Sequence, residues 1–278
     1  MIAAVGDLVL DVTIAPEGEL VPDDEREARI ELGGGGQAAN FCAWAASLGE
    51  RARLITRVGD DDIGRSLVAE LEGAGVEVAA RVAPEPTGAV AVLVGQGGSR
   101  AFARQRGAGR GLRPEDVEGA WLEGVALLHV SGYALHSEPL AAAVRRTAAL
   151  ARQGRALLSV DLASAADLKA SGPERIAVEL AQLGPELLFA TELEAAVMPV
   201  PLDRLAKVPV VKLGARGCSI FGRRVPTPVV SVVDGTGAGD AFAAAFCLAY
   251  LEGATLLEAA GRAVLVGARA VTQLGARP

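Results

Sequence analysis

The residues best suited to chemistry stand together near the end of the chain, in Asp234-Gly235-Thr236-Gly237-Ala238-Gly239-Asp240. Apolar residues 229–233 before this stretch predict a buried strand, and residues 241–252 after it, which end at Gly253, predict a helix. A glycine-rich turn between a strand and a helix points unpaired backbone N–H groups at an anion. Asp240, at the start of the helix, could accept a proton from a substrate; the alternative is an aspartate that caps the helix.

Two polar residues in the first forty positions could bind hydroxyl groups. Asn40 is the only asparagine in the chain and lies one turn into a predicted helix that follows Gly35 and Gly36. Its amide can donate and accept hydrogen bonds, which suits a sugar hydroxyl, although asparagine is also common at helix starts. Asp11 interrupts an apolar strand. It could accept hydrogen bonds from vicinal hydroxyls, or it could be a charge on an edge strand.

Two further segments could contact phosphate or metal. Residues 208–213 predict a strand that ends in a turn bracketed by Gly214 and Gly217. Ligands bind at the carboxyl ends of strands in a doubly wound sheet, although a plain β-turn explains the same residues. Glu194 could hold a hydrated magnesium ion, or it could lie on the solvated face of a helix.

The elements that must position these residues alternate between short apolar strands and helices, which predicts a parallel sheet covered by helices on both faces. Strands are predicted at 2–5, 8–14, 28–32, 53–58, 126–130, 156–160, 187–190, 208–213 and 229–233. Helices are predicted at 38–48, from the end of 59–64 to about 72, and at 138–152, 173–182, 192–197, 241–252 and 255–273.

Two early segments, 8–32 and 88–105, do not follow this alternation of strands and helices. They predict a small antiparallel sheet, in which 88–94 and 99–105 form a hairpin. We expect a single domain over residues 1–278, with this small sheet as a lid.

Composition argues against several classes of protein. An excess of seven negative charges, without any basic run, argues against a nucleic-acid partner. Charges or glycines interrupt every apolar stretch before about 18 residues, so no membrane span is expected. The N-terminus lacks the basic region of a signal peptide, and the three cysteines are scattered. We therefore expect reduced thiols in a cytoplasmic protein.

Together, these motifs resemble the ribokinase-like (PfkB-type) carbohydrate kinases over nearly the whole length. Residues 234–242 are similar to the C-terminal signature of that family, and residues 35–40 and 59–64 are similar to its N-terminal signature. The resemblance implies a three-layer α/β sandwich with a mainly parallel central sheet and a small β-sheet lid. It also implies ATP and Mg²⁺ as cofactors. The chain has no Gly-x-x-x-x-Gly-Lys-Ser/Thr motif, which excludes a P-loop kinase.

The resemblance also implies roles for individual residues. Asp240 matches the general base, and the backbone amides of Gly237, Ala238 and Gly239 match the anion hole. The positions that match sugar-binding residues are Asp11, Gly35, Gly36 and Asn40, and those that match nucleotide-binding residues are Thr191, Lys212, Gly214, Arg216 and Gly217. Glu194 matches the glutamate of the NxxE motif of the family, which helps to order magnesium through water, and Asp234 matches a potassium-binding position.

Three positions depart from the pattern of the family. Thr191 stands where NxxE has asparagine, and Gly235 and Lys212 stand where threonine is frequent. We predict an ATP-dependent kinase that phosphorylates a hydroxyl of a small sugar or sugar derivative. One alternative is a nucleoside or vitamin kinase of the same fold, which the low aromatic content disfavours. The other is a non-catalytic sugar sensor. An exposed lid sheet could also pair with a second copy, which predicts a homodimer.

The predicted lid strand 99–105 and the residue after it carry three arginines on one face. Arg100, Phe102, Arg104 and Arg106 alternate with Ala101, Ala103 and Gln105. The arginine face could simply be solvated and keep an edge strand soluble. Alternatively, Arg104 could reach under the lid to an anionic part of the substrate, since a guanidinium suits carboxylates and phosphates. That alternative predicts a sugar acid or a sugar phosphate as the substrate.

Overall fold

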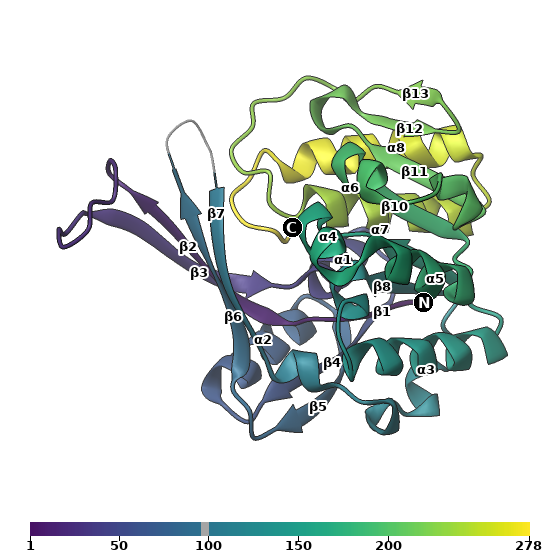
Figure 1. Ribbon diagram of the computed structural model, residues 1–278, viewed down its shortest axis with the longest axis horizontal. Coiled ribbons are helices and arrows are strands. Elements are labelled where there is room, and N and C mark those ends of the chain that lie inside the picture. Colours follow the sequence, from purple (N-terminus) through teal and green to yellow (C-terminus); the bar gives the residue numbers. More distant parts are fainter. Residues whose placement is uncertain (96–99) are drawn as a thin grey trace.

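The chain is built on a large sheet in a computed structural model that describes residues 1–95 and 100–278. Within the described residues this sheet has nine strands in the order β13-β12-β11-β10-β9-β8-β1-β4-β5 (Figure 1). All pairs from β11 to β5 are parallel, and β12 and β13 add an antiparallel edge. The strands are β1 (Ile2–Val5), β4 (Ala52–Gly59), β5 (Val76–Ala83), β8 (Leu127–Ser131), β9 (Leu157–Asp161), β10 (Leu187–Thr191), β11 (Val208–Lys212), β12 (Cys218–Ile220) and β13 (Arg223–Val225).

Helices cover both faces of this sheet, so the predicted three-layer sandwich is confirmed. One face packs against α1 (Gln37–Ser47), α2 (Asp62–Gly73), α7 (Ala238–Leu251) and α8 (Leu256–Ala270). The other packs against α3 (Leu140–Gln153), α4 (Ala165–Ser171), α5 (Pro173–Leu183) and α6 (Glu192–Val197). The central strands are mostly apolar because both of their faces are buried, and the buried polar pair His129 and Ser159 is hydrogen-bonded over 2.9 Å.

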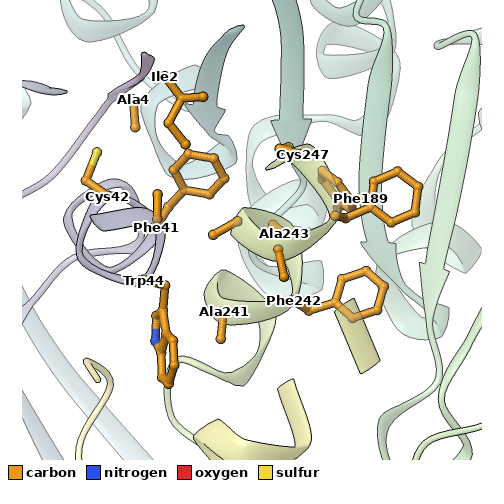
Figure 2. Close-up of a cluster of buried hydrophobic side chains, with 14 of the residues drawn as sticks. Ile2, Ala4, Phe41, Cys42, Trp44, Phe189, Ala241, Phe242, Ala243 and Cys247 are labelled. Atoms are coloured by element: carbon orange, nitrogen blue, oxygen red, sulfur yellow. The ribbon is translucent and has the colours of Figure 1, made fainter. Parts of the chain in front are cut away.

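Helix α7 lies at the centre of the first of these two layers. Every side chain from Asp240 to Cys247 is buried, and alanines allow α7 to approach α1 closely. Figure 2 shows Phe41 and Trp44 on α1 to one side of α7, and Phe189 of the sheet near Phe242 on the other. A helix that is buried on nearly all sides cannot shift without opening the core. The first turn of α7 is therefore held firmly in place.

A second sheet of four strands, among the described residues, projects from the body of the molecule (Figure 1). Its order is β3 (Ala28–Gly35), β2 (Val9–Pro16), β6 (Thr87–Val94) and β7 (Arg100–Gly107). The paired strands of the predicted hairpin are present, while most of the predicted connection at 95–98 lies outside the described residues. The sheet is mixed rather than antiparallel, because β2 and β6 are parallel. They follow the parallel strands β1 and β5, so both leave the large sheet in the same direction.

The prediction of a strand at 229–233 was wrong. These residues form no regular structure, and the side chains of Val229, Val232 and Val233 are exposed. The last strand of the sheet ends at Val225, and Pro226 and Pro228, which follow, lack the backbone donors that a further strand needs. Four elements were not predicted: β5, β12, β13 and α4. β5 is an edge strand that contains the charged residues Glu77 and Arg81, and these interrupt the apolar run by which a buried strand is recognised in a sequence.

No helix among the described residues is long and apolar enough to cross a membrane. The cysteines Cys42, Cys218 and Cys247 are free and buried.

Candidate active site

A cavity lies between the two sheets, at the carboxyl ends of the central strands. It has a volume of about 660 Å³. The last residues of three neighbouring strands line it, namely Asp161 of β9, Thr191 of β10 and Lys212 of β11. Strands β2, β6 and β7 of the small sheet line the cavity from the other side. Of the residues that the sequence predicted, it brings together Asp11, Gly36, Asn40, Arg104, Thr191, Glu194, Lys212, Gly237, Gly239 and Asp240.

Asp240 lies buried in the first turn of α7 at the floor of this cavity. The N-cap of α7 is Gly237, with φ 73°, and Asp240 lies within the first turn of the helix, so the alternative that Asp240 is the N-cap was wrong. Instead, the Asn40 amide Nδ2 donates to the Asp240 carboxylate Oδ2 over 2.9 Å. Burial raises the pKa of Asp240 from 3.8 to about 7; the Asn40 bond lowers it, and nearby Asp161 raises it. A carboxyl with this pKa can accept a proton near neutral pH.

Lys212 provides a buried cation beside Asp240. Its Nζ bonds the carboxylate of Asp161, which is itself buried. Burial lowers the pKa of Lys212, but the carboxylates of Asp161 and Glu194 more than offset this and hold it above its usual value. A Cβ at Gly239 would lie 3.1 Å from Lys212 Nζ. The ammonium therefore lies against the N-terminal turn of α7, and a glycine there leaves room for it.

Thr191 and Glu194 form a reciprocal cap at the start of α6. The Thr191 backbone N–H donates to Glu194 Oε2 over 2.7 Å, and the Glu194 N–H donates to Thr191 Oγ1 over 3.3 Å. The Glu194 side chain is buried at the cavity, so the solvated-face alternative was wrong. Burial and the charge of Asp161 raise the pKa of Glu194. A threonine at position 191 thus keeps the glutamate oriented even though the asparagine of NxxE is absent.

Only some of the residues predicted at the nucleotide-binding turn 212–217 line the cavity. Lys212 lines the cavity, whereas Gly214, Arg216 and Gly217 form a turn beside it and do not line it. Arg216 pairs with Glu192 on the surface. Gly217 has φ 87°, and a Cβ there would lie 2.0 Å from the Val225 carbonyl. The turn therefore requires a glycine to pack against β13.

The predicted sugar-binding residues gather under the small sheet. Asp11 lies on β2, an inner strand, so the edge-strand alternative was wrong. A Cβ at Gly35 would lie 2.2 Å from the Asp11 carboxylate, which explains a glycine there. Burial raises the pKa of Asp11 to about 6, with Arg277 lowering it and Asp234 raising it. Gly33–Gly35 belong to β3, and only Gly36, with φ 101°, forms the turn into α1.

Arg104 and Arg106 of β7 line the cavity. Arg104 Nη1 donates to Asp167 Oδ2 over 2.7 Å, and Arg106 Nη1 donates to Asp7 Oδ2 over 2.5 Å. Both guanidinium groups lie over the ring of Tyr133, at 5.7 Å for Arg104 and 4.6 Å for Arg106. Phe102 lines the same cavity, and the side chain of Arg100 lies outside the described residues.

Asp234 lies just outside the main cavity and lines a smaller one of about 150 Å³. Its Oδ1 accepts hydrogen bonds from the backbone N–H of Thr236 over 2.9 Å and from Thr236 Oγ1 over 2.7 Å. Its Oδ2 accepts one from the Gly275 N–H over 3.1 Å. The carboxylate therefore orders the loop that leads to Gly237.

Four cavity residues with charged side chains were missed from the sequence. They are Asp7, Arg106, Asp161 and Asp167, of which Arg106 was placed on a face but given no role. Asp161 is the last residue of β9 and could have been found as a charged residue at a strand's carboxyl end. Asp167 lies on α4, a helix that was not predicted.

Comparisons with known proteins agree with this geometry. The family model described as pfkB family carbohydrate kinase matches residues 1–278. A 2-dehydro-3-deoxygluconokinase of Thermoproteus tenax is 33% identical over 84% of this chain and 79% of its own. The crystal structure of adenosine kinase from Sinorhizobium meliloti is 24% identical, with a TM-score of 0.89 over 100% of this chain and 95% of that one. A putative ribokinase II from E. coli in complex with ATP and Mg²⁺ is 23% identical, with a TM-score of 0.87 over 99% and 94%.

Both structures confirm the ribokinase-like fold. The match of the family model over the whole length, together with the identity to a curated sugar kinase, shows the family. The chain belongs to the pfkB family of carbohydrate kinases.

Proposed function

We propose that this protein transfers the γ-phosphoryl group of ATP to a hydroxyl of a small sugar or sugar derivative, with Asp240 as the general base. The observation that carries the proposal is the buried Asp240 carboxylate, which faces the cavity at the N-terminal turn of α7 and is held there by Asn40. A non-catalytic sugar sensor would need no base with a pKa of about 7.

In this mechanism the acceptor hydroxyl lies within hydrogen-bond reach of Asp240 and gives up its proton as its oxygen attacks phosphorus in line. The first backbone N–H groups of α7, at Gly237, Ala238 and Gly239, have no partner within the helix. They carry the positive end of the helix dipole and can stabilise the charge on the transferring group. Lys212, next to Gly239, adds a full positive charge at the same point.

The same residues fit ATP and Mg²⁺, with which the E. coli ribokinase II was crystallised. Among the described residues, no group of three acidic, histidine or cysteine side chains could hold a metal directly. We therefore assign Glu194 to Mg²⁺ through water, since this ion keeps several of its waters. Mg²⁺ would neutralise phosphate charge. Thr191 and Lys212 would face the phosphates, with Gly214, Arg216 and Gly217 beside the rest of the nucleotide.

On the acceptor side, we assign Asp11, Gly35, Gly36 and Asn40 to the hydroxyl groups of the sugar. The Asp11 carboxylate can accept hydrogen bonds from hydroxyl groups. At Gly36 a Cβ would lie 2.2 Å from the Asp7 carbonyl oxygen, so only a glycine allows the turn that brings Asn40 to the cavity. Among the described residues that line the cavity, the aromatic ones are Phe102 and Tyr133, which gives little support to a nucleoside kinase.

A sugar acid is a more specific candidate for the acceptor. The observation that favours it is the pair of guanidinium groups, Arg104 and Arg106, that face the cavity from the lid. The Thermoproteus tenax relative is named as a kinase of such an acid. Both arginines already pair with carboxylates, Asp167 and Asp7, so an acidic group would have to share or replace one of these pairs.

The test is an ADP-release assay over a panel of neutral sugars, sugar acids, sugar phosphates and nucleosides, with Asp240→Asn as the control. The proposal is supported if the wild type turns over a neutral sugar or a sugar acid and Asp240→Asn does not. The class of compound that is turned over best then identifies the acceptor. Turnover of nucleosides alone would favour the nucleoside alternative. Specific binding of a sugar without ADP release from any compound would favour the sensor.

We also propose a homodimer formed through the outer face of the small sheet. Ile30 and Leu32 on β3 are 60% and 70% exposed and alternate with the cavity-facing Glu31. A second copy could bury the same face symmetrically. Sedimentation of wild type and of Leu32→Glu tests this: a dimer that becomes a monomer on substitution supports it, and a monomeric wild type contradicts it.

Finally, we propose a potassium ion beside Asp234. It would order the loop before Gly237 and so pre-organise the anion hole.

A further inference from the structure

We propose that Arg277 is a positioning residue that fixes the Asn40 amide with its N–H groups toward Asp240. The inference rests on the proposed role of Asp240 as general base. It gives the C-terminal segment 275–277 a part in the active site that neither the motifs nor the family comparison assigns.

The Arg277 guanidinium joins three elements around the cavity. Its Nε donates to Asn40 Oδ1 on α1 over 3.3 Å, and its Nη2 donates to the Gly35 carbonyl on β3 over 3.1 Å. Its Nη1 pairs with Glu70 Oε1 on α2 over 2.7 Å. The side chain is only 11% exposed. A buried guanidinium with three fixed acceptors has one orientation.

This orientation decides which way the Asn40 amide faces. Arginine has N–H donors and no acceptor, so only the amide oxygen can face it. The Asn40 NH₂ group must then face the opposite side, where it donates to Asp240 Oδ2 over 2.9 Å. With the amide reversed, its oxygen would face the Asp240 carboxylate. Arg277 therefore favours the ionised form of Asp240 through Asn40.

The segment that carries Arg277 is itself held against the active site. The Ala276 carbonyl accepts a hydrogen bond from Trp44 Nε1 over 3.0 Å. A Cβ at Gly237 would lie 2.2 Å from the same carbonyl, and a Cβ at Gly34 would lie 1.9 Å from Arg277 Nη1. The two glycines thus leave the space that the segment occupies. Figure 1 marks the C-terminal end between the small sheet and the body of the molecule.

The charged groups that face Asp240 come from three other elements. Asp161 on β9 and Asp11 on β2 raise its pKa, whereas Lys212 on β11 and the Asn40 bond lower it. Arg277 also lowers the pKa of Asp11. Loss of Arg277 therefore acts on Asp240 by two opposing routes. Through Asn40 it makes protonation of Asp240 easier, whereas a higher pKa of Asp11 removes negative charge nearby and makes it harder. The Asn40 bond influences the pKa of Asp240 more than the charge of Asp11 does, so the net expectation is easier protonation.

The single asparagine of the chain makes this inference directly testable by NMR. Labelling with ¹⁵N-asparagine gives one side-chain NH₂ group, that of Asn40. In the wild type, its shifts should follow the titration of Asp240. In Asp240→Asn, which adds a second side-chain NH₂ group, the Asn40 signals should lose this pH dependence. In Arg277→Met, the midpoint should move up by about half a pH unit or more, and the hydrogen-bonded proton should move upfield.

A matched control is Arg262→Met, which removes an exposed ion pair with Glu252 and should leave the Asn40 signals unchanged. If Arg277→Met does not fold, as judged by thermal unfolding, Glu70→Ala removes the partner of Nη1 and should produce a smaller change of the same sign. The inference would be overturned if the variant that folds gave the same Asn40 chemical shifts and the same titration midpoint as the wild type.

The proposed function is tested separately in the same proteins. An active Asp240→Asn enzyme would refute the general base. An inactive one, together with unchanged Asn40 signals in Arg277→Met, would refute only the role of Arg277.

Discussion

Asp240→Asn should stabilise the fold above neutral pH and, at the same time, remove turnover. Burial holds the pKa of Asp240 at about 7 in the folded chain, against an ordinary value of 3.8. A carboxyl whose folded-state pKa is raised contributes its full stability below the unfolded pKa. This contribution is lost as the pH rises from 3.8 through about 7. At high pH the wild type must keep a buried negative charge, which an asparagine does not carry.

The size of the effect follows from the two pKa values. Their difference corresponds to about 4 kcal/mol of unfolding free energy once both states are ionised. The variant should therefore gain up to about 4 kcal/mol at pH 8 and only about 2 kcal/mol at pH 5.5, where the folded carboxyl is still protonated. An asparagine at this position can still accept a hydrogen bond from Asn40, so the gain should not be offset by an unpaired amide.

Urea unfolding at pH 5.5 and pH 8 measures the gain, and ADP release measures turnover, which should fall by at least about a hundredfold. Asp203→Asn, at an exposed position, is the matched control and should change stability by less than about 0.5 kcal/mol at either pH. A variant that is less stable than the wild type at pH 8, or a gain that is equal at both pH values, would refute the reasoning about the buried charge. Turnover within about tenfold of the wild type would refute the general base.

Three further predictions concern the ligands. Asp11→Ala and Asn40→Ala should each weaken sugar binding in calorimetry by about 1–3 kcal/mol with ATP binding nearly intact, and unchanged sugar affinity in both would remove them from the site. Arg104→Ala should raise KM for an acidic acceptor at least about tenfold and leave KM for ATP unchanged; a neutral sugar turned over equally by wild type and variant would contradict an acidic substrate. Potassium should raise turnover through the loop at Asp234, and equal rates in potassium, sodium and a bulky organic cation at matched ionic strength would argue against the ion.

Much of the fold could be predicted from the sequence because its signals are local. Alternation of apolar strands with helices predicted the parallel sheet and its two helical layers, and both were observed. The helix after the glycine-rich stretch was predicted at 241–252 and extends from Ala238 to Leu251. The exception at 229–233 shows the limit of such signals. An apolar run becomes a strand only if a neighbouring strand has free hydrogen-bonding groups for it.

The candidate site divides in the same way. Asp240, Asn40, Asp11 and Glu194 could be predicted as candidates because each stands next to a recognisable glycine turn, strand or helix start. Their mutual geometry could not, since Asn40 and Asp240 are 200 residues apart and meet only because α1 packs on α7. Only the tertiary structure showed that the Asp240 carboxylate accepts a hydrogen bond from Asn40 and is not the N-cap of α7.

The residues that the sequence did not reveal are those whose role comes from contacts alone. Asp161 matters because β9 and β11 both flank β10, so that its carboxylate reaches Lys212. Arg277 has no motif, and its importance depends on the path of the chain back to α1. The sequence alone determined which groups could do chemistry, because residue type and local pattern specify their functional groups. The tertiary structure decided their partners and protonation, because burial and charge depend on which distant segments come together.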